Sequence, residues 1–468
     1  MERHGRAHRR SGGIAPTSEE PGMNAAFRAV AALLVMAASP LIAQEIPPSP
    51  PPPAAPSPAA EPSPAPGPSP VSSPTPAPKA PFVAGYKNGF VLQSESGDFV
   101  LKVTGYAHAD GRFASGDQAE AVTDQFLIRR ARPIVQGTVA KYFDFYVNPD
   151  FGGGTTVLQD AYLDVRFTPK LRFRVGKGKT PFGIERLQSA QSLHFVERAL
   201  PNNLVPNRDI GLQVHGELLQ GALGYQLGVL NGVADGGSVD TDLNDSKDLA
   251  GRLFVQPWRK KGSSPLRALG FGVAGTAGKA SGPLRPYVSV SQVPVFAYAA
   301  TVTASGDRRR WSPQAWFFLG PFGLLAEHVT ARHDVQRVET GQPTTTATLT
   351  NSAWSVTGSW LLTGEDASYG NVKPKNFFVP SAGKWGALQF VARFNRLDVD
   401  EASFTGGFAD AAKSVRRAIA WGAGLNWIWN SNLKYVLDYE QTRFKGGAVQ
   451  SLDRPTEKSF QTRLQLAF

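Results

Sequence analysis

From Phe99 onward, apolar and polar residues alternate with a period of two, and clusters of Gly, Asp, Asn, Ser or Pro interrupt the alternation about every ten residues. Between residues 143 and 151, one face carries Phe, Val and Pro while the other carries Asp, Tyr and Asn. This period belongs to β-strands that are apolar on one face only. It predicts strands at residues 99–113, 126–139, 143–151, 159–167, 171–175, 211–218, 223–230, 268–277, 322–333, 388–397, 421–429, 435–442 and 460–468. The body is therefore all-β.

Alternation alone fits both a soluble sandwich, with its apolar faces inside, and a transmembrane barrel, with its apolar faces toward lipid. Aromatic residues gather near the strand ends, as a membrane-interface belt requires. The last predicted strand ends on the aromatic Phe468, as in bacterial outer-membrane barrels. A closed barrel also leaves no unpaired strand edge in lipid. At about 24 residues per strand and connection, residues 82–468 predict an antiparallel transmembrane barrel of about sixteen strands.

The N-terminus predicts export. Arg28 precedes an apolar run from Ala29 to Ala38, and a small residue, Ala43, closes the segment. This is typical of a signal peptide at residues 1–43, with Met23 as the expected start. Residues 44–81 follow as a spacer, with 17 prolines between Pro47 and Pro81. Such a run favours a stiff polyproline II chain that joins no packed core. It is either a periplasmic reach toward the cell wall or a disordered tail.

Composition excludes several kinds of site. The chain has no cysteine, which removes disulfides, thiolate zinc sites, iron–sulfur clusters and cysteine nucleophiles. Residues 82–468 contain 43 Lys and Arg against 33 Asp and Glu. An exported basic protein meets its partners outside the cytoplasm, so we expect no nucleic acid among them. No cofactor is expected.

Short motifs along the chain resemble the phosphate-selective porin O/P family over nearly all of residues 99–468. The motifs, in order, are Phe126–Arg132, Asp160–Tyr162, Val175–Glu185, Glu197–Arg198, Leu362–Asp366, Gly424–Trp427 and Arg463–Leu466. The resemblance implies a trimeric outer-membrane porin with sixteen strands. It also implies that a long third loop, roughly residues 177–209, folds into the lumen and narrows it. Passive, anion-preferring diffusion of small solutes would be the function, with phosphate or polyphosphate as cargo.

Basic residues mark the expected anion pathway. Polar strand faces carry Arg130, Arg132, Arg166, Arg172 and Arg174, and the loop adds Lys177, Lys179, Arg186, Arg198 and Arg208. The resemblance matches Arg129, Arg130, Arg174, Arg186 and Arg198 to basic positions at the narrow part, and Asp160 joins the predicted site. Alternation, however, places Arg129 on the same face as Leu127 and Val135. Rings of Arg and Lys in a narrow passage attract anions and repel cations.

These charges also fit a lattice of ion pairs along the wall. If the turn at residues 168–170 sets the register, Asp164 lies opposite Arg174, and Arg166 lies opposite Arg172. One arginine would then be held by a carboxylate, and the other pair would stay uncompensated.

Three departures from the family bear on phosphate selectivity. Tyr106 stands where phosphate-selective members have an arginine, and Gln159 stands where they have an acid. Between residues 281 and 307 the only arginine is Arg285, where those members carry a row of them; Arg308, Arg309 and Arg310 follow. A general porin with anion preference is the first interpretation.

Other classes of function are weaker. Ser192 and His194 form a chance Ser–His pair without a nucleophile motif, which makes a hydrolase unlikely. His328 and His333 lie five residues apart and so point to opposite faces of a strand, which argues against shared metal ligation. Acidic residues at 235, 240, 242, 245 and 248 match no calcium loop and predict a solvated loop tip. A non-conducting anchor, tethered to the cell wall by the spacer, remains an alternative.

Overall fold

The computed structural model describes residues 82–115, 123–238, 240–260 and 262–468. The predicted signal peptide and spacer lie outside these residues. No helix within them is long and apolar enough to cross a bilayer.

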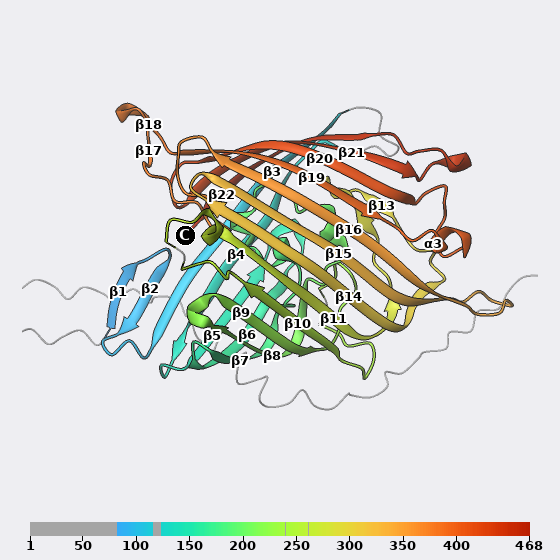
Figure 1. Cartoon of the computed structure of the whole chain (residues 1–468), viewed down its shortest axis with the longest axis horizontal. Helices are drawn as coiled ribbons and strands as arrows, with labels where there is room; N and C mark the ends of the chain where they lie inside the picture. Colours follow the sequence, from blue (N-terminus) through green and yellow to red (C-terminus); the bar gives the residue numbers. More distant parts are fainter. Residues whose placement is uncertain (1–81, 116–122, 239, 261) are drawn as a thin grey trace, which may run out of the picture. The chain divides into compact units, whose positions relative to one another are not determined.

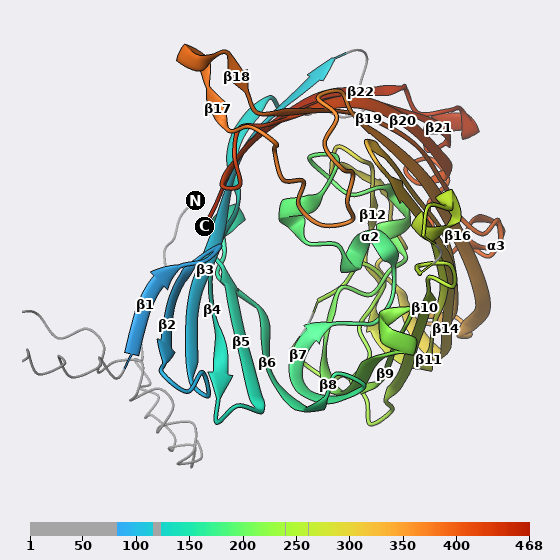
Figure 2. The ribbon, with the colours of Figure 1, turned by 60° about the vertical axis from the view of Figure 1, so that its left-hand side comes forward.

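Sixteen antiparallel strands form one closed sheet (Figures 1 and 2). Each strand pairs with the next along the chain, and the last strand pairs with the first, Lys458 opposite Ser115 through Ala467 opposite Tyr106. The strands are β3 (Val100–Ser115), β4 (Gln125–Val139), β5 (Phe143–Asp150), β6 (Val157–Thr168), β7 (Leu171–Lys179), β8 (Arg208–Leu218), β9 (Leu223–Leu230), β10 (Asp248–Val255), β11 (Leu269–Pro283), β14 (Val302–Leu319), β15 (Phe322–Arg337), β16 (Thr345–Leu361), β19 (Ala387–Asp398), β20 (Val415–Ile428), β21 (Leu433–Gly446) and β22 (Glu457–Ala467). The sixteen-stranded barrel is confirmed.

The two faces of the wall differ as the alternation predicts. On β19, Phe390 and Phe394 point outward and are about 40% exposed, while Gln389, Arg393 and Asn395 point inward and are buried. The wall is thus apolar outside and polar inside, which is the reverse of a soluble protein and the arrangement that suits lipid.

A short hairpin extends the sheet beyond the barrel. Its strands β1 (Phe82–Tyr86) and β2 (Phe90–Ser94) pair with each other, and β2 pairs with the start of β3 (Figure 1). Gly105 and Phe468 exchange two main-chain hydrogen bonds of 3.0 Å just beyond that pairing. The Phe90 and Phe468 rings lie 6.1 Å apart. The hairpin therefore continues the edge of β3 where the last strand stops.

The remaining elements lie in the connections between wall strands. They are α2 (Ile184–Leu187), β12 (Tyr287–Val288), β13 (Pro294–Phe296), β17 (Phe378–Val379), β18 (Lys384–Trp385), α3 (Ala402–Thr405) and the 3-10 turns η1 (Gly152–Gly154), η2 (Ala190–Ser192), η3 (Leu200–Asn203), η4 (Leu219–Gly221), η5 (Pro265–Ala268), η6 (Pro380–Ala382) and η7 (Val449–Ser451).

The connection between β7 and β8, residues 180–207, lies inside the barrel, and we call it the inner loop (Figure 2). Its main-chain N–H groups donate to inward-facing wall residues: Val196 to Asp438 Oδ2 at 2.7 Å, and Leu200 to Asn395 Oδ1 at 3.1 Å. The N–H of Ile184 donates to Glu327 Oε2 at 3.0 Å. The predicted boundaries, 177 and 209, lie slightly too far out because both flanking strands extend into that range.

An apolar core fills part of the lumen. Phe182, Leu200 and Leu204 of the inner loop pack against Tyr287 and Phe296 of the connection at residues 284–301. Small wall residues complete it, among them Ala274, Ala331, Ala353, Ala418 and Ala420. Much of the segment between residues 281 and 307 packs into this apolar core, which accounts for its single arginine.

A second segment supports the inner loop from the opposite side. Strands alternate in direction, so the connection at residues 362–386 lies at the barrel end where β22 stops. From there the Tyr369 hydroxyl donates to the Ile184 carbonyl at 2.5 Å, and Gln188 Nε2 donates to the Tyr369 carbonyl at 2.9 Å. The Ser192 hydroxyl donates to Asn371 Oδ1 at 2.7 Å. The inner loop is thus held by the wall, by the apolar core and by this segment.

Candidate functional site

A cavity of about 520 Å³ lies between the inner loop and strands β3–β8. Eight of its lining side chains are cationic and four are acidic. Seven of the nine predicted site residues line it: Arg129, Arg130, Arg132, Asp160, Lys179, Arg186 and Arg198. Arg208 and Arg285 line it as well, as do Tyr106 and Gln159, the two departures from the family. Most of the residues predicted for an anion pathway therefore line one continuous space.

Two predicted residues lie elsewhere. Arg174 donates to Asp164 Oδ2 at 2.8 Å, and its guanidinium lies over the Tyr162 ring, 4.1 Å from the centroid. Lys177 is buried and pairs with Asp240 Oδ1 at 2.5 Å. Neither lines this cavity, and their assignment to the anion pathway stays a prediction. The partner of Arg174 is the carboxylate that the predicted register placed opposite it, whereas sequence spacing did not reveal the partner of Lys177.

A β-bulge brings Arg129 into the lumen. Ile128 pairs with Ala109 and Arg130 pairs with His108, so Arg129 is an extra residue on β4. A bulge breaks the strict alternation of faces. Arg129 Nε consequently reaches Glu197 Oε1 on the inner loop at 2.6 Å, and the outward placement of Arg129 by alternation was wrong.

A second bulge lies on β6. Asn148 pairs with Asp160 and Pro149 pairs with Leu158, so Gln159 is the extra residue on this strand. Gln159 and Asp160 both line the cavity. Asp160 accepts two hydrogen bonds from Arg208, at 3.0 and 3.1 Å, and one from Asn148 at 2.7 Å. The Asp160 carboxylate is therefore occupied by protein donors.

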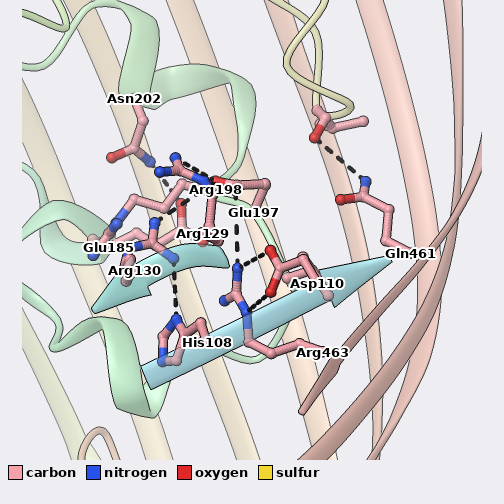
Figure 3. Close-up of polar contacts among 12 residues, drawn as sticks. His108, Asp110, Arg129, Arg130, Glu185, Glu197, Arg198, Asn202, Gln461 and Arg463 are labelled. Atoms are coloured by element: carbon pink, nitrogen blue, oxygen red, sulfur yellow. Dashed lines mark hydrogen bonds and ion pairs between the residues drawn. The ribbon is translucent and has the colours of Figure 1, made fainter. Parts of the chain in front are cut away.

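Glu197 stands at the centre of an arginine cluster (Figure 3). Its carboxylate lies 2.7 Å from Arg112, 2.6 Å from Arg129, 3.8 Å from Arg130 and 3.9 Å from Arg463. Burial alone would raise the pKa of Glu197, but these four guanidinium groups hold that pKa well below its ordinary value. Glu197 is therefore ionised, and sequence reasoning, which saw it only as part of a motif, missed this role.

Three other cations that line the cavity bind main-chain carbonyls rather than carboxylates. Lys179 Nζ donates to the carbonyls of Leu187 and Gln188, both at 3.0 Å. Arg186 donates to the Asn202 carbonyl at 3.0 Å, and Arg198 donates to the carbonyls of Glu185 and Gln188 at 3.2 and 3.1 Å. Within the described part of the chain, none of the three forms an ion pair with a carboxylate. We call them the open cations.

Crowding acts on two of the open cations. Burial, followed by the nearby charges of Arg198 and Arg208, lowers the pKa of Arg186 to about 9. Burial also lowers the pKa of Arg198. Both side chains stay protonated at neutral pH, and a bound anion would relieve their mutual repulsion.

The hairpin of β6 and β7 has the predicted register, with Asp164 opposite Arg174 and Arg166 opposite Arg172. The expectation that the second pair is uncompensated was wrong. Asp144, on the neighbouring strand β5, forms ion pairs with both Arg166 and Arg172. A carboxylate from a strand outside the hairpin thus completes the wall lattice.

The weaker sequence candidates are engaged with other partners. Ser192 turns to Asn371 rather than to His194. His333 is buried inside the barrel, whereas His328 packs against Trp311 on the outer face. Asp235 and Asp248 are buried in ion pairs with Arg310 and Arg308, so the solvated tip predicted for the acidic loop was wrong at these two positions. No group of three metal-ligating side chains occurs among the described residues.

A family model described as phosphate-selective porin O and P matches residues 101–468. Among solved structures, the outer membrane channel DcaP of Acinetobacter baumannii has a TM-score of 0.50 at 10% identity, covering 82% of this chain and 100% of that chain. OmpT of Vibrio cholerae has a TM-score of 0.49 at 10% identity, with 79% and 98% covered. An anion-selective porin from Comamonas acidovorans has a TM-score of 0.48 at 9% identity, with 79% and 100% covered. No curated protein sequence matches.

Proposed function

Since the chain belongs to the phosphate-selective porin O and P family and forms a multi-pass β-barrel channel of the bacterial outer membrane, we propose that it conducts small solutes passively and prefers anions. The observation that carries this proposal is the set of open cations, Lys179, Arg186 and Arg198, which face the cavity without carboxylate partners. Among the described residues, Arg285 also lines the cavity without a carboxylate partner, whereas the other lining cations, Arg129, Arg130, Arg132 and Arg208, lie beside acids.

The geometry suits conduction rather than tight binding. The open cations are held by main-chain carbonyls, so no carboxylate neutralises them, but each has fewer donors left for a ligand. Arg presents a planar fork that matches oxyanion oxygens in pairs. Several moderate sites in one passage attract an anion and still let it leave. Narrowing of the passage by the inner loop is part of this proposal.

The phosphate filter of the family is altered here. Tyr106 accepts a hydrogen bond from Arg132 at 2.9 Å, where an arginine would add a charge. Gln159 lines the cavity but has no carboxylate to accept the proton of monohydrogen phosphate. The neighbouring acid, Asp160, is bound to Arg208. We therefore propose a general anion preference, with phosphate or polyphosphate as cargo that is admitted without a strict filter.

We further propose, from the family, that the barrel works as a homotrimer and that residues 1–43 and 44–81 serve as signal peptide and periplasmic spacer. A non-conducting anchor is the competing function, and it predicts no conductance steps at all.

Reversal potentials across planar bilayers in a salt gradient test the proposal. One charge about 7 Å from an ion in water changes the energy of that ion by about 0.6 kcal/mol, which is about a threefold change in permeability. Arg198→Gln should therefore lower the ratio of chloride to potassium permeability by about that factor. Arg396→Gln is the matched control, because Arg396 pairs with Asp398 away from the cavity. Equal effects of the two variants, or a wild type without anion preference, would refute the proposal.

A further inference from the structure

The arginine cluster around Glu197 is assembled from three strands and one loop (Figure 3). Arg112 comes from β3, Arg129 and Arg130 from β4, and Arg463 from β22. All four converge on one carboxylate that the inner loop carries inward. The side chain of Arg129 is 30% exposed, and Arg129, Arg130 and Glu197 line the cavity. The cluster is therefore in contact with the solute pathway.

The charges in this cluster do not balance. Arg463 is already held by Asp110, through two hydrogen bonds of 2.7 Å. Glu197 then remains as the carboxylate shared by Arg112, Arg129 and Arg130. Converging guanidinium groups are what proteins use to bind tetrahedral oxyanions. Without the Glu197 charge, Arg129 and Arg130 would face the cavity with donors to spare, and Arg112 would lie behind them without its carboxylate partner.

We propose that this cluster is a latent oxyanion site and that Glu197 occupies it as a tethered anion, so that phosphate and sulfate pass without being trapped. The inference rests on the proposed function. A carboxylate attached to the same chain competes at a high effective concentration, which a free anion at ordinary concentrations cannot match. Conduction benefits, because one deep site would hold the ion and block the passage. Glu197 is thus a specificity-determining residue, and the open cations remain the transit sites.

Glu197→Gln tests this assignment, because the amide keeps the shape of the side chain and removes its charge. The full-length protein is reconstituted in planar bilayers with chloride as the carrier, and inorganic phosphate or sulfate is added as the blocker. We expect the half-blocking concentration to fall at least tenfold against the wild type. Calorimetric titration of the detergent-solubilised protein with phosphate should show the same tighter binding.

Asp150→Asn is the matched control. It removes one negative charge from the same cavity, but Asp150 pairs with a single arginine, Arg132, at 2.7 Å. We expect its half-blocking concentration to change by less than threefold. Adding Arg129→Gln to Glu197→Gln should remove most of the gain. Glu197→Asp, which retracts the carboxylate by one methylene, should give an intermediate fall and serves if Glu197→Gln does not assemble.

The outcomes are distinct. If Glu197→Gln, or Glu197→Asp in its place, blocks no better than Asp150→Asn while the wild type prefers anions, the latent site is refuted and the proposed function stands. If the wild type shows no anion preference, the proposed function itself fails.

Discussion

The position of the inner loop depends on the apolar core inside the barrel, and Phe182 offers the sharpest test. Its side chain is fully buried among Leu200, Leu204, Tyr287 and Phe296. Replacing a buried Phe by Ala costs about 3–5 kcal/mol, because apolar contacts are lost and a cavity remains. Only the loop side of the core is weakened, since the barrel wall keeps all its main-chain hydrogen bonds.

The expected effect on the loop follows from that cost. A tenfold change in an equilibrium corresponds to about 1.4 kcal/mol, so Phe182→Ala should raise the population of detached loop conformers by roughly 100-fold to a few thousandfold. Single-channel recordings should then show frequent excursions to higher conductance, and the anion preference should fall during them, because the open cations Arg186 and Arg198 leave with the loop.

Phe394→Ala is the control for this experiment. Phe394 points outward from β19 and is 43% exposed, so its loss removes a similar ring without touching the core. Current noise and anion preference should stay at wild-type values in this variant. If Phe182→Ala also leaves conductance, noise and selectivity unchanged, the core does not hold the loop, and the argument for its role is refuted.

Two further predictions concern the same loop. Burial, followed by the charges of Lys434 and Arg393, lowers the pKa of His194 to about 4, so the folded loop keeps this histidine neutral. Above about pH 6.5 the folded loop pays no free-energy cost for keeping His194 neutral. As the pH falls to 4, this cost grows to about 3 kcal/mol. In the wild type, the current noise caused by loop detachment should therefore rise as the pH falls from about 6.5 to 4, and His194→Gln should flatten this rise. A rise in the variant as steep as that of the wild type would contradict the role of His194. The Tyr369 hydroxyl of residues 362–386 donates to the Ile184 carbonyl of the inner loop, so Tyr369→Phe should raise the current noise from loop detachment by about fivefold, the value of one lost hydrogen bond of about 1 kcal/mol. Noise equal to that of the wild type would show that this hydrogen bond does not support the loop.

Much of the barrel could be predicted because its rule is local. Thirteen wall strands follow from alternation, but β10, β14 and β16 do not. In β14 the run Arg308–Arg310 resembles a loop, but it pairs with both neighbouring strands, and Arg308 and Arg310 are bound to Asp248 and Asp235. In β16 the inward face mixes Ser and Asn with Leu349, Ala353 and Leu361, and the outward face includes Thr, so its polarity contrast is weak. Alternation fails where the lumen face is satisfied by distant partners.

The candidate site was predictable in residue type but not in geometry. Arg129 and Gln159 enter the cavity through bulges, which shift the register by one residue and leave no mark in a single sequence. The role of Glu197 could not be predicted either, since its arginine partners lie 65 or more residues away from it along the chain. Long-range ion pairs require the closed barrel before they can be recognised.

The division between paired and open cations has a consequence for selectivity. Wall arginines such as Arg132, Arg174 and Arg208 are each bound to a wall carboxylate, so the wall alone contributes little net field. Two of the three open cations, Arg186 and Arg198, belong to the inner loop, and Lys179 binds loop carbonyls. Under the proposed function, pore width and anion preference therefore depend chiefly on the inner loop, with Arg285 of the connection at residues 284–301 as a further cation of the cavity. Changes that detach the loop and changes that remove its charge should reduce anion preference together, while wall substitutions that remove a matched ion pair should leave it unaltered.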